Sequence, residues 1–330
     1  MLKIAMQPSR KRKGGAGSFL NHLDRIYSET QVANVVGSKN PFQDIGLFNS
    51  VASGLPFKPY VLRMDGIYFD QFETMGSNRK LNKKIYHSIR NAQGIIFQSR
   101  FSKQLIVDHY GFIECPSTII SNGSPIALKS RLNQSASKDV VKIVCSAVWR
   151  RHKRLKETIA VVKQLYQHYP CELVVLGDVE EAVEECDFVT FMGDVNREVL
   201  FSHLQDADIF LHLCWLDNCP NSVVEALAHR VPVVCSNLGG TQELIESTGG
   251  GRVANCDELV DCSKLVDLYN PPPLNVDAVV REIAFVLENS QVLKSEMDVT
   301  PIDINEVSKR YLNFLVEILN IENRSLQTAC

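Results

Sequence analysis

Short apolar runs alternate with amphipathic stretches along most of this chain. Runs such as residues 2–6, 94–99 and 172–177 are mainly apolar with little polar alternation, which is typical of parallel strands buried on both faces. Between the runs, apolar residues recur every three or four positions, as they do on one face of a helix. Strands that alternate with helices in this way predict an α/β fold with parallel sheets.

The strand and helix pattern recurs in both halves of the chain, so we expect two Rossmann-like units. Expected strands lie at residues 2–6, 31–36, 45–48, 59–64, 94–99, 117–120, 140–148, 172–177, 188–191, 207–213 and 233–235. Expected helices lie near residues 19–27, 79–91, 101–110, 154–166, 197–205, 257–269, 276–289 and 303–319.

The polar stretch at residues 128–139, rich in Ser, Lys and Asn, is typical of a linker. It separates a predicted first domain at residues 1–130 from a second at residues 138–300, followed by a terminal helical segment at residues 301–330. A chain of 330 residues is long enough for two such domains.

Composition excludes some classes of function. A net charge of -3 argues against a nucleic-acid binder held by bulk charge. The ten cysteines show no paired spacing of the kind that binds structural zinc, so we expect no metal site. Several cysteines lie in apolar runs as free thiols, which indicates a reducing compartment. Because no apolar run approaches the length needed to span a bilayer, we expect a cytoplasmic protein.

The most informative stretch is Asp-Asn-Cys-Pro-Asn-Ser-Val-Val-Glu-Ala-Leu-Ala at residues 217–228, directly after an expected strand. In an open α/β sheet, Asp217 then lies in the crevice where such folds bind ligands. Asn221 and Ser222 suit a helix N-terminus, whose free amides favour an anion. Glu225 follows on the first turns of the helix. Two carboxylates with amide donors between them fit a nucleotide-sugar, whose ribose and sugar flank a diphosphate.

This stretch resembles the E-x7-E element of retaining glycosyltransferases of the GT-B fold, in particular glycosyltransferase family 4, with Asp217 in place of the first Glu. The resemblance implies two Rossmann-like domains that face each other across a cleft, with the acceptor in the first and the donor in the second. It implies that Asp217 contacts the donor sugar and Glu225 the ribose. It also implies that the terminal helix crosses back to the first domain. The expected donor-binding residues in this stretch include Asn218, Cys219, Pro220, Asn221 and Ser222.

A cationic loop follows the first strand of the second domain. Arg150, Arg151 and Lys153 would stabilise the departing diphosphate. Relatives use an Arg and a Lys here; Lys153 falls on the Lys position and Val148 on the Arg position, so Arg150 or Arg151 must substitute. The alternative is ordinary surface charge.

Glycine-rich segments give further donor-binding candidates. The resemblance implies that Gly15, in a glycine loop at residues 14–17, lies against the donor phosphate, although a tight turn explains the glycines equally well. It places the nucleobase near Met192 and Gly193. It also implies a second phosphate loop at Gly239 and Gly240, followed by Thr241 and Glu243, for which helix capping is the alternative.

Asp65 is the remaining catalytic candidate. The family commonly places histidines after the expected strands of the first domain, whereas this chain has Asn49-Ser50 after one and Asp65-Gly66 after another. Asp65 is therefore the best polar candidate at the rim of that domain. The alternative is an Asp-Gly turn.

These features predict a retaining glycosyltransferase, independent of metal and cofactor, that moves a sugar from a nucleoside diphosphate to an acceptor hydroxyl in glycan or cell-surface polysaccharide synthesis. The resemblance favours front-face attack; double displacement with Asp65 or Asp217 as nucleophile is the rival. Other readings are a nucleotide-sugar epimerase and a non-catalytic nucleotide-sugar-binding subunit. A dinucleotide oxidoreductase fits less well, because residues 14–17 do not complete G-x-G-x-x-G.

The expected partners are the nucleotide-sugar and a glycan or lipid-linked glycan acceptor, and no nucleic acid. Two basic runs, at residues 10–13 and 79–84, suggest peripheral association with the inner face of a membrane, because clustered cations attract anionic lipid. Solvated surface charge is the alternative.

Overall fold

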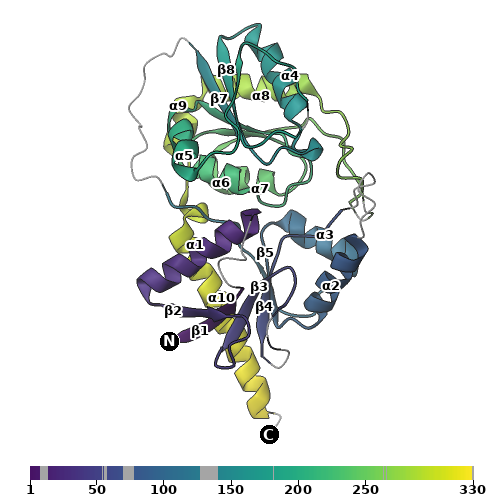
Figure 1. Cartoon of the computed structure of the whole chain (residues 1–330), viewed down its shortest axis with the longest axis vertical. Coiled ribbons are helices and arrows are strands. Elements are labelled where there is room, and N and C mark those ends of the chain that lie inside the picture. Colours follow the sequence, from purple (N-terminus) through teal and green to yellow (C-terminus); the bar gives the residue numbers. More distant parts are fainter. Residues whose placement is uncertain are drawn as a thin grey trace.

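The structure is a computed structural model that describes residues 1–7, 14–53, 55, 58–69, 78–126, 140–180, 182–262, 264 and 266–328. Two α/β domains are stacked along the long axis of the molecule (Figure 1). Domain 1 contains the first six strands and domain 2 the last six. The expected linker at residues 128–139, with its boundaries at 130 and 138, and the basic run at residues 10–13 lie outside the described residues.

Domain 1 has a six-stranded parallel sheet with the order β2-β1-β3-β4-β5-β6. Its strands are β1 (Leu2–Met6), β2 (Ala33–Gly37), β3 (Ile45–Asn49), β4 (Tyr60–Met64), β5 (Gly94–Phe97) and β6 (Ser117–Ile119). Its helices are α1 (Gly14–Thr30), α2 (Asn78–Arg90) and α3 (Arg100–Tyr110).

Domain 2 repeats this plan with the order β12-β11-β10-β7-β8-β9. Its strands are β7 (Val141–Ser146), β8 (Cys171–Leu176), β9 (Val189–Phe191), β10 (Ile209–His212), β11 (Val233–Ser236) and β12 (Gly251–Ala254). Its helices are α4 (Leu155–Tyr166), α5 (Arg197–Asp206), α6 (Asn221–Ala228), α7 (Thr241–Thr248), α8 (Val276–Glu288) and α9 (Ser290–Glu296).

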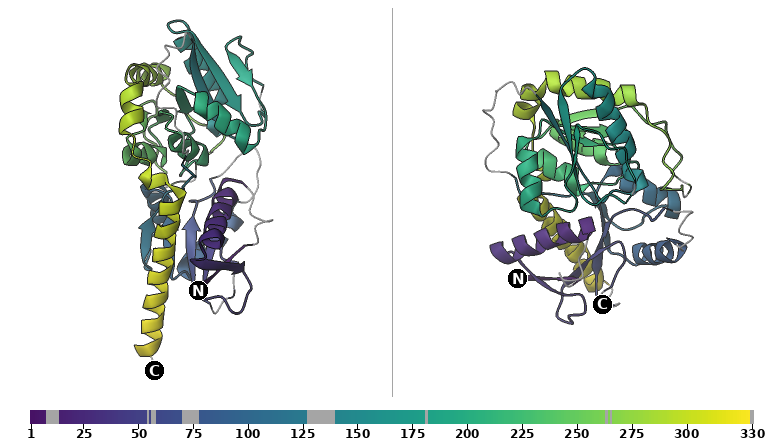
Figure 2. Two further views of the ribbon diagram at one scale, coloured as in Figure 1. Left: turned by 90° about the vertical axis from the view of Figure 1, so that its left-hand side faces the viewer. Right: turned by 45° about the horizontal axis from the view of Figure 1, so that its top comes forward.

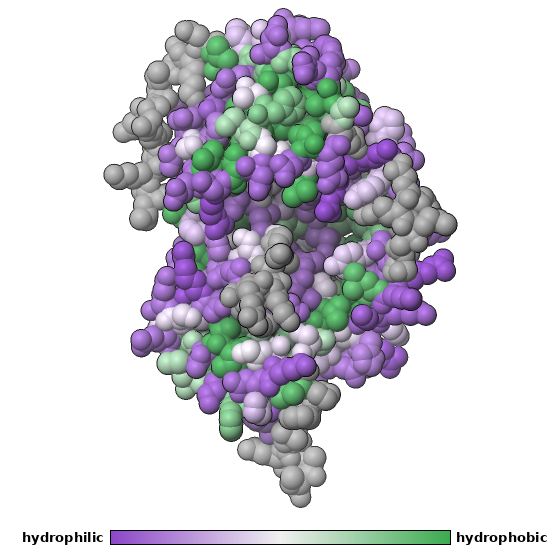
Figure 3. Space-filling model, in the orientation of Figure 1, coloured by the Kyte–Doolittle hydropathy of each residue, from purple (hydrophilic) through white to green (hydrophobic). Residues whose placement is uncertain are grey.

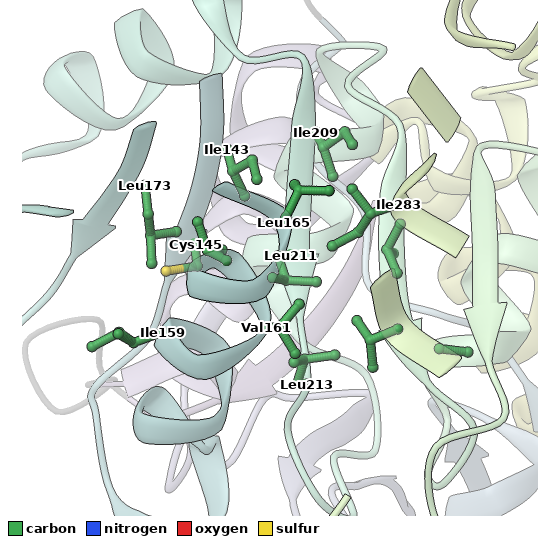
Figure 4. Packing of buried hydrophobic residues seen from close by; sticks show 14 of the residues in the cluster. Ile143, Cys145, Ile159, Val161, Leu165, Leu173, Ile209, Leu211, Leu213 and Ile283 are labelled. Atoms are coloured by element: carbon green, nitrogen blue, oxygen red, sulfur yellow. The ribbon is translucent and has the colours of Figure 1, made fainter. Parts of the chain in front are cut away.

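The apolar runs become strands because both faces of each sheet are covered by helices. In domain 2, Ile143, Leu173 and Leu211 from neighbouring strands pack against Val161 of α4 and Ile283 of α8 (Figure 4). Burial of these side chains is the main term that favours the domain over the unfolded chain. The regular spacing of these side chains fixes the positions of the strands. The strands in turn set the positions of the loops that follow them.

The last helix, α10 (Ile304–Thr328), packs on domain 1 and runs along it in both side views (Figure 2). Val307, Tyr311 and Leu315 of α10 are fully buried with residues of α1 and β1. The phenol of Tyr27 donates to the carbonyl of Ser308 at 3.0 Å. Domain 1 is therefore completed by the end of the chain.

Three local expectations were wrong. The glycine loop at residues 14–17 is the first turn of α1, where amides lack intrahelical partners and glycine is tolerated. Residues 257–269 form no helix among those described there; Asp257 instead pairs with buried Arg154, and Val260, Val266 and Leu268 pack against domain 1. Strand β12 and helix α9 were not expected.

The carboxyl ends of both sheets face the boundary between the domains. On the face shown in Figure 3, hydrophilic residues predominate along this boundary. Within the described part of the chain, no helix combines the length and apolar character needed to cross a membrane.

Candidate functional site

A pocket of about 370 Å³ lies at the domain boundary. Both domains line it, through the ends of strands and the turns that follow them. Its lining from domain 1 comprises Gly15, Arg63, Asp65, Gln98 and Asn122. Its lining from domain 2 comprises Ser146, Ala147, Val148, Lys153, His212, Asp217, Asn218, Cys219, Pro220, Asn221 and Ser222.

The ion pair between Lys153 and Asp217 is the centre of the domain 2 wall, with Nζ and Oδ2 2.5 Å apart. Leu216, at φ 59°, turns the chain after β10 so that the Asp217 carboxylate meets Lys153. Burial by itself would raise the pKa of Asp217, but the Lys153 charge lowers it below its usual range. Asp217 is therefore a carboxylate at neutral pH.

His212 and Cys214 lie beside this pair. Nε2 of His212 is 3.8 Å from the Asp217 carboxylate, and burial lowers the pKa of His212 to about 4, so the ring is neutral at pH 7. Ligand atoms of His212, Cys214 and Asp217 lie within 4.8 Å of one another, close enough to share a cation. The Lys153 ammonium already neutralises Asp217 there, and its charge opposes that of a second cation.

Two glycines allow the loop at Asp217 to lie against the loop that precedes α7. The amide of Gly240 donates to the Asp217 carbonyl at 2.7 Å. A Cβ on Gly240 would lie 2.0 Å from the Asn218 carbonyl oxygen, and one on Gly239 would lie 2.5 Å from that of Asp217. Both glycines are thus required by the approach of the two backbones.

Helix α6 begins at the pocket. Pro220 precedes it and supplies no side-chain hydrogen bond to the first turn. No capping side chain therefore competes with a ligand for the amides of that turn. The Asn221 side chain reaches domain 1 instead, where Nδ2 donates to the Gly15 carbonyl at 2.8 Å and Oδ1 accepts from Asn122 at 2.8 Å. The N-terminal end of α6 therefore offers an anion site that faces both domains.

Glu225, one turn further along α6, accepts a hydrogen bond from Arg197 at 2.7 Å. Burial raises the pKa of Glu225, and the Arg197 charge opposes that rise. The carboxylate lies beside the pocket and not in its lining.

The domain 1 wall is built on Arg63, a fully buried arginine at the end of β4. It donates to the carboxylate of Asp65, to Asn49 at 2.5 Å and to Asn122 at 2.6 Å. Gln98 also donates to Asp65. This network holds the Asp65 carboxylate at the pocket, opposite Lys153 and Asp217.

One part of the chain matches a known family. Residues 139–268 match the sequence profile of the family described as glycosyl transferases group 1. The matched segment lies mostly in domain 2 and is called the group 1 domain.

Two named E. coli proteins are similar to part of this chain. The E. coli proteins called O-antigen biosynthesis glycosyltransferase WbnH and probable O-antigen biosynthesis glycosyltransferase WbiN are each 29% identical to this chain over 102 residues. That match covers 30% of this chain and 29% of either relative.

The whole chain, with its group 1 domain, has the GT-B fold. The Anabaena protein HepE, solved in complex with UDP-glucose, is 16% identical with a TM-score of 0.66, over 96% of this chain and 100% of HepE. The lipopolysaccharide outer core galactosyltransferase WaaB is 12% identical with a TM-score of 0.66, over 94% of this chain and 98% of WaaB.

The expected cationic cluster of the group 1 domain is divided between two pockets. Lys153 faces the pocket at the domain boundary, whereas Arg150 and Arg151 line a different pocket of about 480 Å³ beside Trp149 and Tyr269. The structure thus brings together Lys153 and Asp217, but not the two arginines, because the short helical turn at Arg151–Lys153 points these side chains apart.

The lining of the pocket does not include the other expected donor residues of the group 1 domain, which are Met192, Gly193, Gly239, Gly240, Thr241, Glu225 and Glu243. Met192 and Gly193 follow β9, where the Gly177 amide donates to Gly193 at 2.7 Å. Thr241 is buried at the start of α7. The Glu243 carboxylate accepts the amides of Arg100 at 2.7 Å and of Phe101 at the start of α3, and so links the two domains.

Sequence reasoning missed five polar residues of this region: Arg63, Gln98, Asn122, His212 and Arg197. Arg63 and His212 are polar residues at the ends of apolar runs, and that signal could have found them. Asn122 lies in a Ser-Asn-Gly turn after β6. Arg197 carries no distinguishing sequence signal, because an arginine in the first turn of a helix is usually solvated.

Proposed function

We propose that this chain is a retaining, metal-independent glycosyltransferase that moves a sugar from a nucleoside diphosphate to an acceptor hydroxyl. The observation that carries the proposal is the Lys153–Asp217 pair beside the N-terminal end of α6. The free amides of α6 and the Lys153 ammonium suit a diphosphate, and the Asp217 carboxylate suits sugar hydroxyls. Glu225 is the hydrogen-bond acceptor for the ribose.

In the proposed reaction, the bond between the anomeric carbon and the diphosphate oxygen breaks, and the acceptor oxygen bonds to that carbon on the same face. The departing phosphate oxygen takes the acceptor proton. Lys153 and the α6 amides stabilise the negative charge that grows on the diphosphate, with no cofactor beyond the donor. Asp65, held by Arg63 and Gln98, lies where an acceptor hydroxyl would approach from domain 1.

Double displacement is the rival mechanism. Asp217 is ionised, as a nucleophile must be, but its Oδ2 is engaged by Lys153. Asp65 accepts from Arg63, Asn49 and Gln98, and these donors stabilise its charge and reduce its reactivity. Both carboxylates therefore fit binding better than covalent attack.

A bacterial surface polysaccharide is the proposed product class, because the E. coli relatives are named for O-antigen biosynthesis. The acceptor is then a glycan or a lipid-linked glycan.

Helix α2 supports a site at a membrane face, since it carries Arg79, Lys80, Lys83 and Lys84 and no acidic residue. Binding of α2 to anionic vesicles should weaken when the four cations are changed to Gln; unchanged sedimentation with such vesicles would remove this part of the proposal.

The reaction is tested with UDP-, GDP-, ADP- and dTDP-glucose. We expect one donor to raise the melting temperature, because a ligand that binds only the native state stabilises it. With a glycan acceptor, NMR should show the anomeric configuration of the donor in the product, and turnover should persist in EDTA. Product of inverted configuration would refute retention. Consumption of donor without acceptor would favour an epimerase, and binding without turnover a non-catalytic subunit.

A further inference from the structure

A row of three side chains joins Glu225 to domain 1. Glu225 Oε1 accepts from Arg197 Nη2 at 2.7 Å. Nη1 of the same guanidinium contacts Nε2 of His22, midway along α1 in domain 1. The Glu225 side chain is 12% exposed and that of Arg197 39% exposed. Arg197 thus lies between the solvent and the carboxylate, and it touches both domains.

The position of Arg197 is fixed by its own helix. It is the first residue of α5, directly after the cap residue Asn196, whose side chain accepts the Val199 amide at 3.0 Å. Its guanidinium lies 5.4 Å from the ring centre of Phe201, one turn along α5. Phe201 in turn packs against His229, at 4.5 Å between ring centres. Because the helix fixes the backbone of Arg197 and Phe201 holds its guanidinium, the Arg197 side chain has few other rotamers.

The contact keeps Glu225 in the form that binds hydroxyls. Arg197 is the one described residue that donates to the Glu225 side chain, and it uses Oε1 alone. Oε2 therefore remains available to accept from a ligand. An ionised carboxylate is the stronger acceptor, and the adjacent guanidinium favours that ionised state against the burial of Glu225.

We propose that Arg197 is a positioning residue for the donor: it orients the Glu225 carboxylate toward the ribose, and through His22 it makes this orientation depend on contact between the domains. The inference rests on the proposed function, in which Glu225 binds the ribose. His22 accepts from the guanidinium, which requires a neutral imidazole. Burial and the Arg197 charge lower the pKa of His22 to about 4, so the imidazole is neutral at pH 7.

The test is a double-mutant cycle read out as the dissociation constant of the donor. The variants are Arg197→Ala, Glu225→Gln and their combination, with the tightest binder among UDP-, GDP-, ADP- and dTDP-glucose as ligand. Arg252→Ala is the matched control, because Arg252 also pairs with a glutamate at 2.7 Å in domain 2 and lies over a phenylalanine ring.

We expect Arg197→Ala to raise the donor dissociation constant about tenfold, the effect of one charge-assisted hydrogen bond, and to leave the KM of the acceptor unchanged. In the Glu225→Gln background the same change should have an effect of less than about twofold. Arg197→Lys should restore part of the affinity, and Arg252→Ala should bind donor as the wild type does. His22→Ala should also weaken donor binding, as Arg197→Ala does.

The outcomes separate the two proposals. If none of the four sugars binds the wild-type protein, both the proposed function and this inference fall. If one binds and Arg197→Ala binds it equally well, the function stands and the inference alone is overturned. Equal effects of Arg197→Ala with and without Glu225 would also overturn it, since Arg197 would then act on the donor independently of the carboxylate.

Discussion

At the scale of single residues, the Lys153 ammonium is the cation that domain 2 supplies to the pocket. It lies 2.5 Å from Asp217, and the Asp217 charge raises the pKa of Lys153 despite its burial. A buried cation held by a carboxylate keeps its charge and its place, which is what stabilisation of a leaving diphosphate requires. Arg150 and Arg151 face another pocket and cannot take over this role from their present positions.

We therefore expect Lys153→Ala to lower kcat by about 100-fold, within the range found when a charge-stabilising donor is removed from an active site. Lys163→Ala is the control, because Lys163 pairs with Glu184 at the surface at 2.7 Å. Steady-state kinetics with donor and acceptor measure the effect. A turnover number equal to that of the control would contradict the role of Lys153.

His212 gives a prediction for pH. Its pKa falls from 6.5 to about 4 on folding, so the unfolded chain binds a proton between these values that the native state does not. The free energy of unfolding is therefore at its full value above pH 6.5 and decreases as pH falls toward 4. Protonation of His212 accounts for about 3 kcal/mol of that decrease.

Urea unfolding from pH 7 to pH 4 measures this effect. His212→Asn should reduce the slope of the unfolding free energy against pH in that window, whatever its effect on stability at pH 7. The same slope in both proteins would show that His212 does not titrate as its burial implies.

At the scale of elements, the loop at Asp217 and the loop before α7 hold each other in place. The parallel bridge between Asp217 and Gly239 and the bond from the Gly240 amide to the Asp217 carbonyl connect them. Ser99, the cap of α3 in domain 1, lies against the same glycine, with its Oγ 2.5 Å from where a Cβ would be. Three elements therefore meet at one residue that has no side chain.

Gly240→Ala should destabilise the protein by about 2 kcal/mol or more and weaken donor binding, because the added methyl meets backbone on one side and Ser99 on the other. Gly37→Ala is the matched control, since a Cβ there meets nothing within 4 Å. Thermal unfolding and donor titration check both variants. Equal stability of the two would mean that the loops can separate without cost.

At the scale of the whole molecule, the two domains are held together by an apolar cluster, in which Trp215 and Leu216 pack with residues of domain 1, and by polar contacts around the pocket. Glu243 reaches from α7 to the amides of Arg100 and Phe101, and Asn122 donates to the Cys219 carbonyl at 3.1 Å. Ser124, near the end of the described part of domain 1, is bonded to Ile302, which lies just before α10, with the Ser124 amide donating to the Ile302 carbonyl at 2.9 Å. Hydrogen bonds between the domains can form and break when a ligand binds or leaves, unlike the contacts of an apolar interface.

Glu243→Ala should therefore increase the radius of gyration of the ligand-free protein in small-angle scattering, because it removes two bonds between the domains. It should also lower kcat severalfold, since fewer molecules hold both walls of the pocket together. Glu184→Ala is the control, as Glu184 pairs with Lys163 at the surface within domain 2. Unchanged scattering for Glu243→Ala would show that other contacts suffice to hold the domains.

The sequence alone determined most of the order of strands and helices, because apolar runs and helical spacing are local patterns that burial selects. It did not predict β12 or α9, and it predicted a helix at residues 257–269 that the described residues there do not form. It also determined that Asp217 and Asn221 follow a buried strand at the edge where such folds bind ligands. It could not determine that residues 257–269 pack on domain 1 without forming a helix, since that depends on surfaces far away in the sequence.

Only the tertiary structure decided which charged residues meet. Arg63 reaches Asn122, Arg197 reaches His22 and Glu225, and Arg150 and Arg151 turn away from Lys153. No local pattern specifies these approaches, because each depends on how two separately folded sheets are set against each other. The physical reason is that burial of apolar groups is non-directional and fixes the elements, whereas hydrogen bonds and ion pairs depend on positions to within a fraction of an ångström.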